Sequence, residues 1–415
     1  MKLAVLENLD PQRATQFAPL FCIQKRRKSM PDGSQIEITN AIDCDGHVLE
    51  PIAALADCLE KKYRDRAIRV EIGDDGLEYF VWNNKRSRLA AGGFGGVLGA
   101  MGASDILPNP DLTYASGSPA AAYDAAARVK RLDGEGVKQA ILYPTLGLLW
   151  EAEIDDPELA AAYCRAYNRW IVDMCAETPG RLYPIAHISM SDVDLAVTEL
   201  ERAVKAGCKG GMLAPYTWTR KAHGHPYYDP LWAKAQELDV PLALHPTFDP
   251  PQFSQFQRFD ELKVKEPIEF SFYFDVLVAQ AMQQAFVSLF NYGMFEKFPR
   301  AKAVVLESQA GWIGNLLDRM DAVWDGPLKA TTELKHPPRF YFDRQCWISA
   351  DPDERALAHL IEPVGADKFF WASDYPHPDH TDDYIGGLKG LIANLAPDTR
   401  AKILGENVRK VYKLD

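Results

Sequence analysis

The sequence lacks several features that mark common classes of protein. Its seven cysteines are scattered and contain no CxxC pair, so we expect reduced thiols rather than a disulfide framework or a cysteine-rich zinc site. No apolar run approaches the about 18 residues that a membrane span needs. The start of the chain has no basic stretch followed by an apolar one, which argues against a signal peptide. We therefore expect a cytoplasmic protein with no membrane partner.

Positive charge is also scarce. The chain has 46 Lys and Arg against 58 Asp and Glu, which gives a net charge of -12. The one basic run, residues 25–28, is short and is expected to be a solvated tail. Without a basic face to neutralise phosphates, nucleic acid is not an expected partner. The Gly-rich stretch at residues 90–105 matches neither GxxxxGK[ST] nor GxGxxG, so it predicts a loop or lid rather than a phosphate site.

What the sequence does contain is a regular alternation of short apolar runs and amphipathic helical stretches. The runs are continuously apolar, as is typical of parallel strands covered by helices. Two of the helical stretches begin at Ser-Pro and Asp-Pro and end at Gly, and two later ones have a similar capped form. The predicted strands are residues 38–48, 137–144, 181–190, 208–215, 240–246, 301–308, 339–349 and 368–376. Eight strand-then-helix units predict an α/β fold, a (β/α)8 TIM-like barrel.

Two long segments interrupt this alternation. Residues 52–118 follow the first predicted strand and residues 247–295 follow the fifth, so both are expected to be insertions. The second contains a long apolar helix at residues 270–298, which is more apolar than one barrel face requires and is expected to pack against another subunit. The predicted organisation is an N-terminal arm, residues 1–37, and a barrel, residues 38–415, that carries both insertions.

Ionisable residues lie where the predicted strands end. In such a barrel these ends meet at one mouth, where catalytic groups gather. Buried charges are costly unless they are paired, and histidine with carboxylate suits Zn, Mn, Fe or Co. The predicted metal ligands are Asp45, His47, Glu50, His245, Glu307 and Asp374, with His187 at the end of the third strand. This set is large enough for one or two divalent ions per chain, with Zn, Mn or Fe expected.

Four other histidines rank lower as ligands. His377 and His380 follow Asp374 closely and are expected to lie behind the ligands or at the surface. His223 and His225 have the spacing of a metal-binding pair, but they fall in a loop before a predicted helix.

As a set, several stretches resemble the amidohydrolase-related (amidohydrolase 2) family, the branch of the amidohydrolase superfamily with aminocarboxymuconate semialdehyde decarboxylase and the resorcylate-type decarboxylases. The stretches are residues 43–51, 131–148, 228–246, 295–321, 369–379 and 402–415. The resemblance implies a metal-dependent barrel enzyme that forms dimers or tetramers. It places Asp45 and His47 in the first-strand metal motif, His245 as the fifth-strand ligand, and Asp374 as an aspartate that binds metal and shuttles a proton.

Two departures from that family shape the functional prediction. The first-strand motif is Asp-x-His rather than His-x-His, and Glu307 stands where the decarboxylases carry a catalytic histidine. A glutamate needs a large pKa shift to act as the same acid–base near pH 7, but it is a good ligand. The leading prediction is therefore a hydrolase, in which a metal-activated water attacks an amide, ester or lactone. Its predicted catalytic residues are Asp374, Glu307 and His187.

Two other activities and one non-catalytic role remain open. A decarboxylase of an aromatic or unsaturated acid needs a cation for the carboxylate, and Arg220 and Arg344 are the strand-end arginines. An iron- or manganese-dependent oxygenase would use the same ligands. A non-catalytic partner subunit ranks last, because the ligands are retained. The expected partner is a small apolar or aromatic molecule, and the predicted substrate-binding residues are Trp312, Trp218, Phe248 and Tyr375, for which ordinary packing is an equal alternative.

Overall fold

The computed structural model describes residues 33, 35–103, 107–262 and 272–415. The predicted arm at residues 1–37 therefore lies almost entirely outside the described residues.

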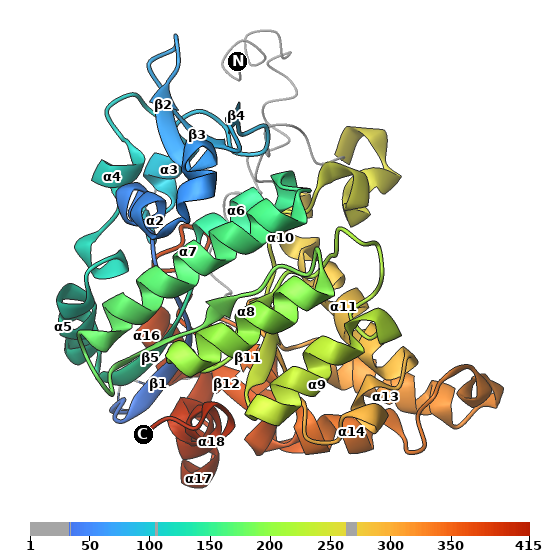
Figure 1. Ribbon diagram of the computed structural model, residues 1–415. Coiled ribbons are helices and arrows are strands. Elements are labelled where there is room, and N and C mark those ends of the chain that lie inside the picture. Colours follow the sequence, from blue (N-terminus) through green and yellow to red (C-terminus); the bar gives the residue numbers. More distant parts are fainter. Residues whose placement is uncertain (1–32, 34, 104–106, 263–271) are drawn as a thin grey trace, which may run out of the picture.

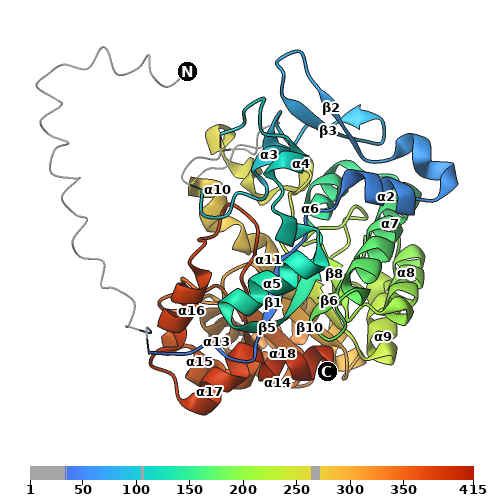
Figure 2. The ribbon, with the colours of Figure 1, turned by 90° about the vertical axis from the view of Figure 1, so that its left-hand side faces the viewer.

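Parallel strands form the centre of the molecule and helices surround them (Figures 1 and 2). One parallel sheet has the order β1-β5-β6 and the other has the order β7 to β12. Their bounds are β1 (Ala41–His47), β5 (Val137–Tyr143), β6 (Leu182–Pro184), β7 (Ala186–His187), β8 (Gly211–Leu213), β9 (Pro241–Leu244), β10 (Lys302–Val305), β11 (Cys346–Ala350) and β12 (Phe369–Trp371). Each predicted strand overlaps one of these elements, or two in the case of residues 181–190.

Backbone hydrogen bonds link the two sheets at both sides. Between β6 and β7, the N–H of Ile185 donates to Leu142 on one side, and the N–H of Ala186 donates to Gly210 on the other. Beyond β12, the N–H of Asp374 donates to Asp45 of β1, and the N–H of His47 donates back to the carbonyl of Tyr375. The ends of the first and last strands are thereby brought together, which places their polar residues side by side.

Helices cover the strands on the outside. The helices are α2 (Ile52–Cys58), α3 (Phe94–Val97), α4 (Tyr114–Gly117), α5 (Ala125–Glu135), α6 (Leu146–Trp150), α7 (Pro157–Ala176), α8 (Val193–Ala206), α9 (Asp229–Leu238), α10 (Phe272–Leu277), α11 (Ala279–Asn291), α12 (Met294–Lys297), α13 (Ile313–Trp324), α14 (Pro338–Gln345), α15 (Ile361–Val364), α16 (Tyr384–Ile392), α17 (Pro397–Ala401) and α18 (Asn407–Tyr412). Asp124, Asp156 and Asp192 cap α5, α7 and α8 by accepting backbone N–H bonds, which fixes where these helices begin.

The interior between the strands is filled by its own apolar cluster. Ile42, Ile141 and Val304 come from three different strands and pack with Val411 and Tyr412 of α18. The hydroxyl of Tyr412 lies 3.0 Å from that of Tyr143 on β5. The C-terminal helix therefore packs into this interior cluster, while the polar residues gather where the strands end.

The segment after β1 holds a small antiparallel sheet of β2 (Arg69–Ile72), β3 (Glu78–Trp82) and β4 (Lys85–Arg86). Together with α3 and α4 it lies at the top of the molecule in Figures 1 and 2.

Two details of the predicted elements were wrong. The first half of the strand expected at residues 339–349 is the helix α14, because Pro338 stands at its first turn, where proline favours a helix start. The long apolar helix is three shorter ones over its described part, with Gly293 at a φ of 61° between α11 and α12. The apolar face of α11 is buried within this chain through residues such as Phe286 and Leu289, so its composition needs no second subunit.

Candidate metal centre

Polar side chains from four strand ends meet at one point. Asp45 and His47 belong to β1, His245 follows β9, and Glu307 follows β10. One ligand atom from each of these four lies within 4.8 Å of the others. Asp374, which follows β12, joins His47 and Glu307 in a second such group, together with His377. The strand-end rule therefore predicted a real convergence of side chains.

The two histidines present their free nitrogens to this centre. His47 Nδ1 lies 2.9 Å from the carbonyl oxygen of Pro144, and His245 Nδ1 lies 2.7 Å from that of Pro246. A carbonyl only accepts, so both Nδ1 atoms carry the proton. The two Nε2 atoms then face each other at 3.1 Å. Histidines held this way offer their Nε2 lone pairs to a metal.

The carboxylates at the centre lack hydrogen bonds. Both oxygens of Asp45, Oε2 of Glu307 and Oδ2 of Asp374 are buried without a hydrogen-bond partner among the described residues. Leaving a buried carboxylate oxygen unsatisfied costs free energy, and a paired positive charge removes most of that cost. Nitrogen and carboxylate donors in this mixture suit a divalent cation. The residues present therefore fit a resident divalent metal ion.

The electrostatics of the centre also call for positive charge. Burial opposes the charged form of His245, yet the carboxylates of Asp45 and Glu307 raise its pKa well above the usual range. Burial, helped by the charge of Asp374, raises the pKa of Glu307 to about 7. Burial and the neighbouring His377 lower the pKa of His47 to about 4, which keeps that ring neutral and able to coordinate.

Two of these residues have an uncommon backbone conformation. Glu307 has a φ of 40° and Asp374 has a φ of 54°. This left-handed region costs a residue with a Cβ about 1–2 kcal/mol. Glu307 follows the end of β10 and Asp374 follows the end of β12.

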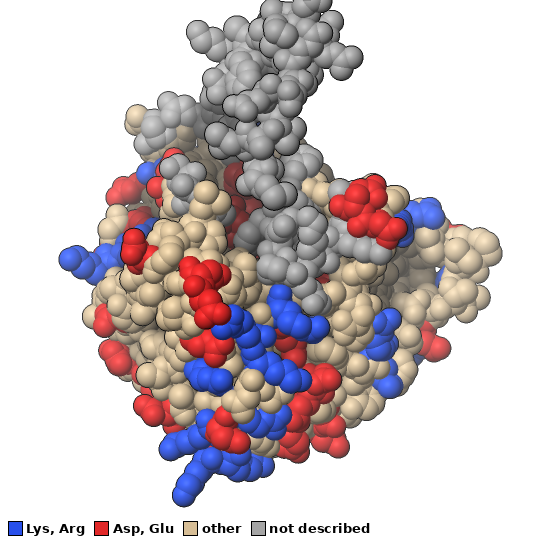
Figure 3. All heavy atoms as spheres, turned by 90° about the horizontal axis from the view of Figure 1, so that it is seen from above, with Lys and Arg blue, Asp and Glu red and all other residues tan. Residues whose placement is uncertain are grey.

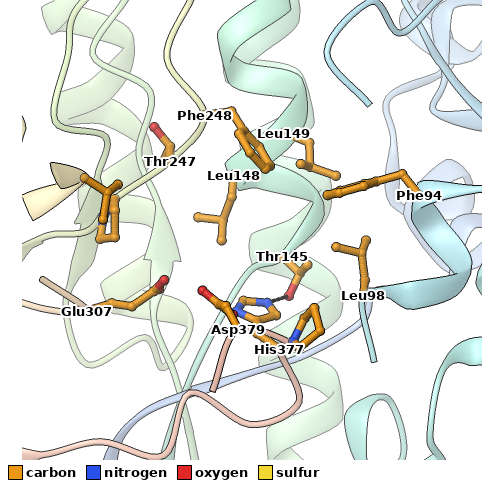
Figure 4. Close-up of a pocket in the computed structure, with 13 residues that line it drawn as sticks. Phe94, Leu98, Thr145, Leu148, Leu149, Thr247, Phe248, Glu307, His377 and Asp379 are labelled. Atoms are coloured by element: carbon orange, nitrogen blue, oxygen red, sulfur yellow. Dashed lines mark hydrogen bonds between the residues drawn. The ribbon is translucent and has the colours of Figure 1, made fainter. Parts of the chain in front are cut away.

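A mainly apolar pocket adjoins the centre (Figure 4). Its walls come from α3 and the residue after it, from α6, and from the loop after β9; they include Phe94, Leu98, Leu148, Leu149 and Phe248. Its polar lining includes Glu307, Asp379, His377 and Thr145, and its cavity volume is about 130 Å³. In Figure 4 the two phenylalanine rings lie on the side of the pocket away from Glu307 and His377. The shape suits a flat apolar body with one polar end at the centre.

Glu50 and His187 are not brought to the centre, unlike the other predicted ligands. The two oxygens of Glu50 accept the backbone N–H groups of Thr145 and Leu146 at 3.1 and 3.0 Å. His187 Nε2 lies 2.6 Å from Oε2 of Glu151. Glu50 and His187 line a separate small cavity. Residues of α6 line both this cavity and the apolar pocket, so this helix separates the two.

The predicted substrate-binding aromatics are divided in the same way. Phe248 lines the pocket next to the centre, whereas the described lining contains none of Trp218, Trp312 and Tyr375. Trp218 and Trp312 donate their indole N–H groups to the backbone carbonyls of Glu151 and Ser308. Tyr375 packs its ring against Arg128 and Arg131.

The predicted strand-end arginines also lie elsewhere. Arg220 sits over the ring of Phe253, and Arg344 over that of Tyr341. Neither arginine is in the described lining of the pocket.

Sequence reasoning missed Thr145, and it expected His377 and His380 only behind the ligands or at the surface. His377 Nδ1 lies 3.0 Å from Oδ1 of Asp374, and its Nε2 lies 2.9 Å from the hydroxyl of Thr145. His380 Nδ1 lies 2.8 Å from Oδ2 of Asp374. Their spacing in the sequence, three and six residues after Asp374, was the available signal. The loop after β12 folds back, so both histidines contact the carboxylate of Asp374.

The described part of the surface, seen from above, shows no separate basic face of the kind that binds nucleic acid. Lysine and arginine side chains are interspersed there with acidic ones (Figure 3). Within the described residues, the search for a helix with the length and apolarity of a membrane span finds none. The six described cysteines are free.

The family model for amidohydrolases matches residues 42–414 of this chain. The chain belongs to the amidohydrolase family. This result confirms the family resemblance, and the parallel sheets within surrounding helices agree with the predicted TIM-like architecture.

Several relatives of known activity are decarboxylases. A gamma-resorcylate decarboxylase from Rhizobium sp. (strain MTP-10005) is 26% identical over 306 residues, which cover 69% of this chain and 86% of that protein. Among solved structures, an amidohydrolase from Mycobacterium avium subsp. paratuberculosis K-10 matches with a TM-score of 0.73, at 20% identity, over 91% of this chain and 98% of that one. A dihydroxybenzoic acid decarboxylase from Polaromonas sp. JS666, solved with manganese and the inhibitor 2-nitroresorcinol, matches with a TM-score of 0.61, at 20% identity, over 91% and 97%.

These relatives contradict the leading prediction from the sequence. That prediction was a hydrolase, chosen because Glu307 replaces the catalytic histidine of the decarboxylases. The similarity to decarboxylases over 69% of this chain and 86% of those proteins shows that this one position was given too much weight. Enzyme activity with a bound divalent metal, by contrast, was a correct prediction.

Proposed function

We propose that this enzyme is a metal-dependent, non-oxidative decarboxylase of an aromatic carboxylic acid. The observation that carries the proposal is the position of the apolar pocket, with Phe94 and Phe248 in its walls, directly against the His and carboxylate centre. The gamma-resorcylate decarboxylases, whose similarity covers most of their length, support the same reaction class.

The metal would be held by Asp45, His47, His245 and Glu307, with Asp374 beside them. When bound, the cation would supply positive charge that orients an anionic substrate and withdraws electron density from it. Manganese is the first candidate, because it is present in the related decarboxylase structure. The described part of the pocket lining includes no lysine or arginine. The metal ion, rather than Arg220 or Arg344, would therefore supply the positive charge for the substrate carboxylate.

The chain's own residues would orient the ring and move a proton. Phe94, Leu148 and Phe248 would hold the flat face of the substrate and exclude water from its apolar part. Decarboxylation releases CO2 and puts one proton on the carbon that it leaves. Asp374 Oδ1, His377 and the hydroxyl of Thr145 form a continuous chain of contacts of 3.0 and 2.9 Å. Burial opposes it, but the carboxylate of Asp374 raises the pKa of His377 to about 9. His377 would therefore hold the proton that passes toward the pocket, and Asp374 would keep it there.

The same proposal covers the architecture around the site. We infer a closed eight-stranded barrel with insertions after the first and fifth strands, whose residues shape the pocket. We also propose that this chain forms a dimer or tetramer, as the family resemblance implies.

Product analysis tests the proposed function. The protein is loaded with Mn²⁺ and incubated with a panel of mono- and dihydroxybenzoates and their vanillate analogues, and CO2 and the corresponding phenols are quantified. We expect equimolar CO2 and phenol from at least one acid, with no oxygen consumed. The matched control is the amide and methyl ester of the same acids, which should not be cleaved. Amide or ester cleavage without CO2 release would overturn the proposal.

A further inference from the structure

A second pocket adjoins the apolar one at the metal centre. The two pockets share Val278, Glu307 and Asp379 in their described linings. The two shared carboxylates lie at the end of the apolar pocket away from the phenylalanine rings (Figure 4). The second pocket is the larger, with a cavity volume of about 310 Å³. A molecule whose reacting group lies at the centre can therefore extend into both pockets.

The described wall of this second pocket combines negative charge with hydrocarbon. It contains no lysine or arginine, and its carboxylates are those of Glu307, Asp351, Asp353 and Asp379. Its histidine, His380, is already paired, since its Nδ1 lies 2.8 Å from Oδ2 of Asp374. The apolar part of the wall is made by Val276, Val278, Ala279 and Pro352. Such a wall favours an occupant that is positively charged but built on carbon, rather than a hydrated inorganic ion.

Asp351 marks this pocket as a binding site, independently of the number of its carboxylates. It follows β11 directly, so it belongs to the ring of strand ends where the other site residues gather. Its side chain is 6% exposed. Its backbone N–H donates to Glu354, but the described residues give its carboxylate no hydrogen bond or ion pair. Asp351 also belongs to no group of possible metal ligands found among them.

A buried carboxylate without a partner is costly. Burial raises the pKa of Asp351 well above its usual range; the charge of His380 opposes this rise, whereas Glu354 and Glu307 add to it. Glu354, three residues further along the chain, is satisfied instead, because its oxygens accept backbone N–H groups at 2.7 and 2.8 Å. A cation beside Asp351 would supply the partner that Glu354 obtains from the backbone.

We propose that this pocket binds a primary ammonium group of the substrate and that Asp351 is the residue that selects for it. The inference rests on the proposed function, because it names the substrate class of that reaction: an aromatic carboxylic acid that carries an aminoalkyl group. An ammonium group has three N–H donors, which suit the unpartnered carboxylate of Asp351 and that of Asp379. The carbon atoms of the aminoalkyl group would lie against the apolar part of the wall.

Binding of product analogues that have no carboxylate tests this proposal without any turnover. The full chain, loaded with Mn²⁺, is titrated with 3-(aminomethyl)phenol and with its neutral counterpart 3-(hydroxymethyl)phenol, and both dissociation constants are measured by isothermal titration calorimetry. We expect the ammonium compound to bind at least about tenfold more tightly, as for a hydrogen bond to a charged group. Equal affinity of the two compounds in the wild type would overturn the proposal.

Three variants locate the preference. Asp351→Asn keeps the size of the side chain and removes its charge, so the preference should fall below about twofold. Asp379→Asn changes a side chain that is 46% exposed; it should weaken the preference too, and it tests the same pocket if Asp351→Asn does not fold. Asp398→Asn removes the same charge from an exposed position outside the described linings of both pockets. It is the matched control, with the full preference expected.

The remaining outcomes are separable. An unchanged preference in both Asp351→Asn and Asp379→Asn would overturn the assignment of the pocket. Loss of the preference when Mn²⁺ is raised beyond saturation of the metal centre would overturn the proposal in favour of an inorganic cation. Binding of the phenols needs no reaction, so an absence of CO2 release from every acid would refute the proposed function while the ammonium preference could still be measured.

Discussion

Two buried carboxylates close together in the chain are satisfied in opposite ways. Glu50 lies five residues after Asp45 and is equally buried. Both oxygens of Glu50 accept backbone N–H groups at the start of α6. Both oxygens of Asp45 have no hydrogen-bond partner among the described residues. Residue type, burial and position near a strand end are therefore shared by a structural carboxylate and a candidate metal ligand. What separates them is whether the protein itself supplies the hydrogen bonds.

Removing a histidine from the metal centre should have the largest effect. His245→Ala deletes one of two facing Nε2 donors, so we expect metal content to fall below one tenth of the wild-type value. Decarboxylation should fall by more than about 100-fold, since even residues behind metal ligands are worth about 10–100-fold. Elemental mass spectrometry and CO2 release measure the two quantities. Full metal content in this variant would contradict the assignment of His245 as a metal ligand.

Removing Glu50 should affect stability instead. Glu50→Ala leaves two buried N–H groups without an acceptor, each worth about 1–3 kcal/mol. We expect the free energy of unfolding, measured by urea denaturation, to fall by about 2–6 kcal/mol. Metal content should match the wild type. The opposite pattern, metal loss at unchanged stability, would show that Glu50 is a metal ligand and not a structural carboxylate.

Asp249 is a third case, because one of its oxygens is buried without a hydrogen-bond partner among the described residues, yet Asp249 belongs to no group of possible metal ligands found there. Burial raises its pKa from 3.8 to about 7. The folded state therefore binds this proton more tightly than the unfolded state, and the associated stability is lost as pH rises from about 4 to 7.

The test is the difference in unfolding free energy between wild type and Asp249→Asn across this pH range. The wild type should lose stability relative to the variant by at most about 1.4 kcal/mol per pH unit, with equal metal content in both. Parallel curves for the two proteins would contradict the burial of a titrating carboxyl at this position.

The smallest effect is expected from the aromatic residues. Phe248→Ala removes a ring from the pocket wall and should raise KM for an aromatic acid about tenfold, the equivalent of about 1.4 kcal/mol of ring contact. Trp218→Phe alters a ring outside the described pocket lining and should change KM less than twofold. Steady-state kinetics on both variants measure this difference, and equal effects would mean that the pocket extends to Trp218.

Much of the fold was predictable because burial on both faces gives parallel strands continuous apolar runs. The predicted strand bounds were too long, and residues 338–345 are helical since the prolines before and at their start favour a helix. The strand-end rule identified Asp45, His47 and His245 correctly as converging residues. It did not separate Glu50 from them, because its hydrogen bonds come from Thr145 and Leu146, about a hundred residues away in the sequence. Only the folded chain shows such partners.

The remaining site residues depended on loop geometry. His377 and His380 reach Asp374 because the chain turns sharply after β12, a turn that periodicity does not reveal. The pocket walls come from segments without a regular repeat, so Phe248 and Trp218 were equivalent in the sequence.

The left-handed backbone at Glu307 and Asp374 has a consequence for engineering. A library selected only for heat resistance would favour glycine or asparagine at these two positions, since those residues adopt this conformation at little cost. Each such gain in melting temperature would erase a carboxylate from the active centre. Selection for thermostability in this enzyme should therefore hold both positions fixed and seek its improvements elsewhere.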